Sequence, residues 1–324
     1  MFQSKIFDIK TACEFEETAL EIFRFQYENI PVYGEFCKLL NRTPSRVQSL
    51  QEIPFLPIDL FKTHRILPKD SKYETIFTSS GTTGQITSKH YIADLNLYEE
   101  SFLRGFERVY GSPKKYVFLA LLPSYLEREG SSLIYMADRL IKESGNEHSG
   151  FYLNDYKGLI KKIHLLEEQQ QSAILLGVSY ALLDLLDLEN FNLHHTLIME
   201  TGGMKGRRRE MIKEELHEIL KQGFGVDKIH SEYGMTELLS QAYSKGDGIF
   251  CPPTWMKILT RDPEDALTYI EGKTGGINVI DLANIYSCAF IATQDLGKIQ
   301  EKNRFEIVGR FDFSDIRGCN LMVL

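Results

Sequence analysis

Apolar side chains at helical spacing mark the start of the chain. In residues 14–29 the pattern predicts an amphipathic helix, and its apolar positions are Leu20, Ile22, Phe23, Phe25 and Tyr27. Pro31 ends this helix, and residues 32–40 indicate a second, shorter one. Residues 53–58 contain Pro54 and Pro57, which exclude a helix, so this stretch is expected to be extended. We expect residues 1–72 to form a helical cap that is continuous with the main domain.

From residue 73 to residue 247 the pattern changes to alternating strands and helices. Residues 116–122 and 173–178 are apolar runs, which are typical of strands covered on both faces. A further strand is predicted at 196–200, and helices are predicted at 131–143, 158–171, 180–186 and 207–221. Strands that alternate with helices favour a mostly parallel sheet flanked by helices, so this segment is predicted to be an α/β core.

After residue 248 the helical periodicity disappears. Short strands joined by turns are predicted at 255–260, 276–280, 289–293 and 305–308. We therefore expect residues 248–324 to form a smaller β-rich subdomain that ends in a tail.

Composition narrows the class of protein. The chain has 324 residues, 43% of them hydrophobic, which is enough for two domains or for one large α/β unit with an appendage. A net charge of −8 argues against a nucleic-acid or anionic-membrane surface. Neither a signal peptide nor a membrane-spanning apolar run is recognisable. The five cysteines are scattered without a CxxC pair, which argues against a zinc ribbon or a disulfide framework and favours a reduced, cytoplasmic protein.

A run of small residues follows the strand-like segment that ends at Thr78. Its members are Ser79, Ser80, Gly81, Thr82, Thr83 and Gly84. Their hydroxyls and backbone N–H groups are suited to an anion such as phosphate, although no Gly-Lys-Ser/Thr of a Walker A loop follows. Considered alone, the run is equally compatible with a linker or a flexible turn.

Two further candidate site residues are carboxylates that lie close to a glycine in the sequence, Glu237 near Gly234 and Asp295 near Gly297. Thr236 and Glu237 follow Gly234, and a carboxylate beside a threonine is suited to a Mg²⁺ ion that bridges phosphates. The alternative is that these two residues only start a helix. His230 lacks the second ligand that a zinc site requires. Asp295 precedes Leu296-Gly297 and is suited to a ribose diol, or alternatively is an ordinary turn residue.

The order of these motifs resembles that of the adenylate-forming superfamily of acyl, aryl and luciferin ligases. The segments, which lie between residues 73 and 318, are TSSGTTGQ (78–85), TGG (201–203), SEYGMTE (231–237), QDLG (294–297) and GRFDFSDIRG (309–318). Within the superfamily the chain is most similar to the LuxE-type acyl-protein synthetases, a similarity supported by residues 25–27, 36–37 and 53–58. The phenylacetate–CoA ligases are the nearest alternative. The resemblance implies an ANL-like large N-terminal domain, with the usual mobile C-terminal domain expected to be absent.

The resemblance also implies a reaction and a set of roles. A carboxylate attacks the α-phosphate of ATP and gives an acyl-adenylate and pyrophosphate. Residues 79–84 would hold the phosphates, Gly202 and Gly203 would lie along the adenine, and Tyr233 would stack near it. Thr236 would contact the α-phosphate, Glu237 would bind Mg²⁺, and Asp295 and Arg310 would bind the ribose hydroxyls.

The sequence departs from the family pattern in two places, and the second departure affects which group is expected to accept the acyl group. Residues 86–88 separate the loop from Lys89 where many relatives have Pro-Lys-Gly, so the role of Lys89 stays open. The sequence also stops shortly after Arg317, where relatives continue into a domain that carries an adenylation lysine. LuxE-type synthetases hold the acyl group on a C-terminal cysteine, and Cys319 matches it. The alternative is that Cys319 packs in a closing strand with its apolar neighbours.

Three functional hypotheses follow. The first is an ATP-dependent acyl-protein synthetase that acylates its own cysteine with a fatty acid. For this hypothesis the family implies a partner that is an acyl reductase, an acyl carrier or an acyltransferase. The second is a ligase of the phenylacetate–CoA ligase type that transfers the acyl or aryl group to CoA or to a carrier protein. The third is a nucleotide-binding module without catalysis.

Overall fold

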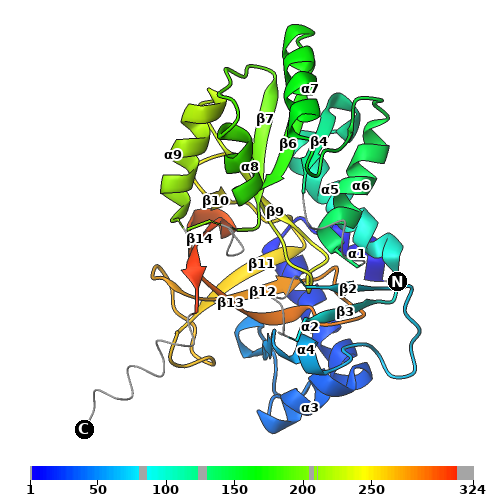
Figure 1. Cartoon of the computed structure of the whole chain (residues 1–324). Helices are drawn as coiled ribbons and strands as arrows, with labels where there is room; N and C mark the ends of the chain where they lie inside the picture. Colours follow the sequence, from blue (N-terminus) through cyan, green and yellow to red (C-terminus); the bar gives the residue numbers. More distant parts are fainter. Residues whose placement is uncertain (1, 80–85, 123–129, 204–207, 210, 312–324) are drawn as a thin grey trace.

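The computed structural model describes residues 2–79, 86–122, 130–203, 208–209 and 211–311. Two sheets organise these residues, and a short hairpin and a helical cap lie beside them (Figure 1). Ser80, Gly81, Thr82, Thr83, Gly84 and Cys319, which the sequence analysis singled out, lie outside the described residues.

The first sheet has the strand order β5-β4-β6-β7-β8-β9. Its strands are β4 (Val117–Leu121), β5 (Gly150–Phe151), β6 (Ala173–Val178), β7 (Thr196–Thr201), β8 (His230–Tyr233) and β9 (Ala242–Ser244). All neighbours are parallel except β8 and β9. Every residue of β4 and β6 is buried, which confirms the prediction of strands covered on both faces.

Helices cover both faces of this sheet (Figure 1). They are α5 (Leu95–Tyr110), α6 (Ser132–Ser144), α7 (Tyr156–Glu168), α8 (Ser179–Leu186) and α9 (Lys213–Phe224). Successive residues of β8 point to opposite faces, and they contact different helices. His230 bonds to Tyr110 of α5, whereas Ser231 contacts His217 of α9. Helices α5 and α9 therefore lie on opposite sides of the sheet.

The second sheet is mainly antiparallel, with the order β10-β14-β13-β12-β11. Its strands are β10 (Ile249–Phe250), β11 (Met256–Arg261), β12 (Gly275–Asp281), β13 (Phe290–Ile299) and β14 (Phe305–Arg310). A short strand from the N-terminal segment, β1 (Leu56–Pro57), pairs in parallel with β13. The extended stretch predicted at 53–58 thus connects the cap to this sheet.

The cap consists of α1 (Phe2–Phe7), α2 (Ala12–Asn29), α3 (Pro31–Leu39) and α4 (Leu60–Thr63), with a 3-10 turn at Leu50–Glu52. Hydrogen bonds of one polar side chain and the stacking of one aromatic ring attach the cap to the second sheet and to the segment before β13. Gln26 of α2 donates to the carbonyls of Asn284 and Ile285, and its amide oxygen accepts from Ala289. The ring of Tyr33 stacks on Phe290 of β13 with centroids 6.0 Å apart.

Three sequence predictions need correction. Helix α9 begins at Lys213 and not near residue 207, because the backbone of the preceding residue, Ile212, is extended at φ −67° and ψ 154°. Strand β13 runs through Asp295 to Ile299, so Asp295 is not a turn residue. Residues 236 and 237 form a turn and start no helix. Among the described residues, no helix is both long enough and apolar enough to span a membrane.

Candidate functional site

A β-hairpin frames the run of small residues. Strands β2 (Thr75–Thr78) and β3 (Lys89–Ile92) are antiparallel, and Thr78 pairs with Lys89 at the end where the connecting loop begins. The backbone of Ser79 donates to the carbonyl of Ser88 at 3.1 Å, and the backbone of Ser88 donates to Ser79 Oγ at 2.9 Å. We call residues 79–88 the hairpin loop. It connects two paired strands, so it is not a linker between separate units.

Gly130 contacts strand β2 next to the hairpin loop. Its carbonyl accepts from the backbone of Thr78 at 2.8 Å. Its φ of +85° lies in the left-handed region, and a Cβ there would lie 2.9 Å from the carbonyl oxygen of Ile76. Only glycine therefore allows this approach. Lys89 is exposed at the first position of β3.

The second part of the site is a contact among three strands. Asp295 of β13 faces Arg310 of β14 in the sheet register, and Arg310 Nε lies 3.2 Å from Asp295 Oδ1. Tyr233, at the end of β8, donates its hydroxyl to Asp295 Oδ2 at 2.9 Å. Asp295 is only 8% exposed, whereas the Arg310 side chain is 71% exposed. Burial raises the pKa of Asp295, and Arg310 and Tyr233 partly offset that effect.

The third part is the turn at residues 235–238, which we call the Glu237 turn. It is closed by a hydrogen bond from the backbone of Leu238 to the carbonyl of Met235 at 3.1 Å. Glu237 is 5% exposed, and burial raises the pKa of its carboxyl group. A hydrogen bond from Ser88 and the charge of Arg310 act in the opposite direction. The carboxyl group of Glu237 therefore lies beside Ser88, and it is close enough to Asp295 and Arg310 to sense their charges.

Polar residues that the sequence analysis missed hold the Glu237 turn in place. Asp281, at the end of β12, accepts from the backbones of Leu239 and Ser240 at 2.8 and 2.9 Å. Asn284 donates to the carbonyl of Glu237 at 2.8 Å, and His90 contacts the carbonyl of Thr236 at 2.8 Å. A polar residue directly after the apolar run of β12 is a signal that could have identified Asp281. No local pattern identifies His90.

Gly202 and Gly203 follow the carboxyl end of β7. Gly202 has a φ of +69°, and its carbonyl accepts from Ser179 Oγ at 3.3 Å. Among the described residues, no atom lies within 4 Å of where a Cβ on Gly203 would stand. Gly203 lies two residues beyond Thr201, whose hydroxyl donates to Glu232.

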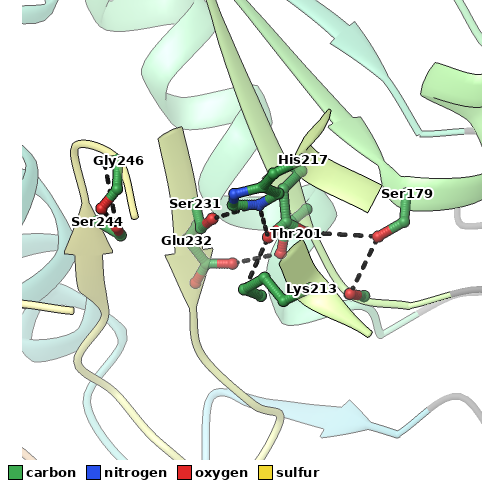
Figure 2. Close-up of polar contacts among 10 residues, drawn as sticks. Ser179, Thr201, Lys213, His217, Ser231, Glu232, Ser244 and Gly246 are labelled. Carbon is green, nitrogen blue, oxygen red and sulfur yellow. Dashed lines mark hydrogen bonds and ion pairs between the residues drawn. The ribbon is translucent and has the colours of Figure 1, made fainter. Parts of the chain in front are cut away.

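A buried polar cluster surrounds the carboxyl end of β7 (Figure 2). Thr201 donates to Glu232 at 2.5 Å, and burial raises the pKa of Glu232 to about 7. Glu200 is also buried, but ion pairing with Lys213 at 2.8 Å and a contact with His217 hold its pKa down to about 2. Burial thus favours the protonated form of Glu232, whereas Glu200 stays ionised, because only Glu200 has a close cationic partner.

The described residues contain no group of three or more His, Cys, Asp or Glu side chains suited to a metal ion. His230 is hydrogen-bonded to Tyr110, and the zinc alternative has no support. A lone buried carboxylate such as Glu237 does fit Mg²⁺, which commonly binds one or two carboxylates together with substrate phosphates. Burial also raises the pKa of the Cys37 thiol to about 12, so Cys37 is a poor nucleophile.

Comparison with known proteins decides the fold. Over 335 aligned positions the chain is 23% identical to the long-chain-fatty-acid–luciferin-component ligase of Aliivibrio fischeri, covering 93% of this chain and 85% of that protein. A 2-hydroxyisobutyryl-CoA ligase, solved in an open conformation with 2-HIB-AMP and CoA, matches with a TM-score of 0.69 and 13% identity, over 93% of this chain and 70% of that one. This chain has the fold of the adenylate-forming ligases. No protein-family model matches it.

A second structural neighbour shows how the lengths compare. O-succinylbenzoate coenzyme A synthetase (MenE) from Bacillus subtilis, solved with ATP and a magnesium ion, matches with a TM-score of 0.52 and 19% identity over 74% of this chain. The match covers half of the length of MenE. The expected similarity to LuxE-type ligases and the expected adenylate-forming fold are both confirmed.

Proposed function

We propose that this protein uses ATP and Mg²⁺ to activate a long-chain fatty acid as an acyl-adenylate, and that it then transfers the acyl group to the thiol of Cys319. Similarity to a fatty-acid ligase over 93% of the chain supports the choice of acid. The partner that would remove the acyl group is an acyl reductase, an acyl carrier or an acyltransferase.

The observation that carries the proposal is the meeting of distant segments around the Glu237 turn. Ser88 ends the hairpin loop, Glu237 follows β8, and the Asp295–Arg310 pair belongs to the second sheet. ATP would extend across these segments from its phosphates to its ribose. An arrangement of this kind supplies donors, acceptors and a cation site without a nucleophile, and phosphoryl chemistry of this type requires no more.

The roles follow the implied assignments. The loop residues 79–84 would hold the phosphates, and Gly202 and Gly203 would lie along the adenine with Tyr233 nearby. Asp295 would accept hydrogen bonds from the ribose hydroxyls, and the exposed guanidinium of Arg310 would reach the same sugar. Thr236 would contact the α-phosphate.

Glu237 would hold the magnesium ion. Its carboxyl group is buried, its pKa is raised, and no ion pair to it is found among the described residues. A bound divalent cation would favour the ionised form, and when bound it would neutralise charge on the phosphate oxygens.

Each of the two proposed chemical steps forms one bond and breaks another. In the first step a carboxylate oxygen of the acid attacks the α-phosphorus, the bond to the β-phosphate breaks, and pyrophosphate leaves. In the second step the Cys319 thiolate attacks the acyl carbon, the acyl–phosphate bond breaks, and AMP leaves. The thiol proton is lost to solvent, since a neutral thiol is a poor nucleophile.

The acceptor assignment is supported by where β14 ends. This strand ends at Arg310, which touches Asp295 within the proposed ribose site. From Arg310 an extended chain reaches about 30 Å by Cys319, at roughly 3.3 Å per residue. The thiol is thus within reach of an adenylate bound at the site.

Transfer to CoA or to a carrier protein is the second candidate. The observation that favours it is the likeness to 2-hydroxyisobutyryl-CoA ligase, which was solved with CoA. Intact-mass measurement after incubation with ATP, Mg²⁺ and a panel of carboxylic acids separates the two. A hydroxylamine-labile acyl adduct supports self-acylation, whereas CoA consumption without an adduct supports the second candidate. Failure of every acid to promote pyrophosphate exchange, despite ATP binding, would refute both.

A further inference from the structure

His90 links the hairpin to the Glu237 turn. It is the second residue of β3, it follows the hairpin loop closely, and it is fully buried at 0% exposure. Its ring packs edge-on against Phe61 with centroids 5.6 Å apart. Its Nδ1 lies 2.8 Å from the carbonyl oxygen of Thr236, which is 146 residues away in the sequence.

The other ring nitrogen leads to the next residue of the turn. His90 Nε2 lies 3.1 Å from Asn284 Oδ1, and Asn284 Nδ2 donates to the carbonyl of Glu237 at 2.8 Å. The carbonyls of both Thr236 and Glu237 are therefore connected to one buried side chain, directly in the first case and through Asn284 in the second.

A neutral imidazole ring carries one N–H, so His90 can donate through only one of these two contacts. A carbonyl can only accept, so Nδ1 must carry a proton to bond Thr236. In a neutral ring Nε2 is then an acceptor that faces another acceptor, Asn284 Oδ1. Rotating the amide only moves the mismatch to the carbonyl of Glu237. Burial lowers the pKa of His90 to about 4, so the neutral ring prevails near pH 7. The alternative tautomer would donate from Nε2 to Asn284 and leave Nδ1 facing the carbonyl of Thr236. The Nδ1 contact is the shorter of the two, at 2.8 Å against 3.1 Å, and it therefore favours the proton on Nδ1.

We propose that His90 is a positioning residue, which through its Nδ1–H bond to Thr236 holds the Glu237 turn against strand β3. That the turn acts in adenylation rests on the proposed function. The contact between His90 and the turn does not depend on it. A displacement of about 1 Å in a catalytic segment lowers rates by about a hundredfold, so the link is expected to affect the maximal rate.

Three substitutions test the link. His90→Asn retains an N–H near the position of Nδ1, His90→Gln places one near Nε2, and His90→Phe has neither. Acid-dependent pyrophosphate exchange by His90→Asn is expected to stay within about threefold of the parent rate. His90→Gln and His90→Phe are expected to lose about ten- to a hundredfold in maximal rate, with the KM for ATP changed by no more than about threefold. Tyr91→Phe in the same strand is the control.

Hydrogen exchange of residues 234–240 is the readout that does not depend on activity. It is expected to accelerate in His90→Gln and His90→Phe and to stay at the parent level in His90→Asn and Tyr91→Phe. If His90→Phe does not fold, the Asn and Gln variants still decide. Equal exchange rates and equal activity in these two would overturn the proposal. If the parent protein shows no pyrophosphate exchange with any acid, the proposed function fails, and the hydrogen-exchange contrast still tests the link.

Discussion

Asp295 and Arg310 face one another across β13 and β14, with Arg310 Nε 3.2 Å from Asp295 Oδ1, and the buried partner of the two is the acid. The carboxylate is thus fixed by Tyr233 on one side while the guanidinium remains exposed on the other. This asymmetry suits a ribose site, because a fixed acceptor and a movable donor can both reach the sugar.

Asp295→Ala is expected to weaken ATP binding by about 2–4 kcal/mol, since hydrogen bonds to a charged acceptor are lost. The KM for the acid should change less than about twofold. Isothermal titration with ATP and steady-state kinetics measure the two effects. Glu271→Ala, an exposed acid in the same subdomain, is the matched control. Equal losses for ATP and for the acid would show that Asp295 is only structural.

Glu237→Gln is expected to lower the adenylation rate by at least about a hundredfold, because the amide no longer attracts Mg²⁺. The ligand-free variant should unfold at the same or a higher temperature than the parent at pH 7. The sign follows from the raised pKa of Glu237, since a raised folded-state pKa means that stability is lost as pH rises above the unfolded value. Magnesium titration of exchange and a thermal melt check both parts. Near-normal activity would contradict the magnesium role.

Glu232 is expected to make the free energy of unfolding depend on pH. Burial raises its pKa to about 7, so its contribution is complete below about pH 4.5 and is lost as pH rises through 7. Relative to Glu232→Gln, the parent should lose on the order of 3 kcal/mol between pH 4.5 and pH 8. Urea denaturation across this range measures the difference.

Glu200→Gln is the control for that experiment. Its pKa is held at about 2 despite burial, so its stabilising contribution is present throughout that pH range and is lost only at lower pH. The substitution should destabilise the protein by a nearly constant amount between pH 4.5 and pH 8. A difference that grows with pH in Glu200→Gln but not in Glu232→Gln would reverse the assignment of the two carboxylates.

Cys319→Ala is expected to retain pyrophosphate exchange and to lose the hydroxylamine-labile mass. Labelling of the parent should rise with pH as the thiolate forms, whereas adenylation need not. Cys251→Ala, which removes an exposed cysteine among the described residues, should label normally. Acylation that persists in Cys319→Ala would identify another acceptor.

Local patterns of apolar residues in the sequence were enough to predict the main strands and helices of this protein. Burial on both faces of β4 and β6 requires unbroken apolar runs, and the helical spacing of apolar residues is sufficient to identify α2. The same holds for the hairpin loop, since the strand before it and its small residues are neighbours in the sequence. The motif order determined the resemblance to adenylate-forming ligases.

Only the tertiary structure decided how the site is assembled. The Leu296-Gly297 pair after Asp295 suggests a turn, yet pairing with β14 extends the strand beyond it. His90 gave no local signal, because the carbonyl that it holds is 146 residues away and a backbone carbonyl carries no sequence identity. The protonation tendencies of Glu200 and Glu232 likewise depend on whether Lys213 reaches one or the other, and sequence spacing does not encode that distance.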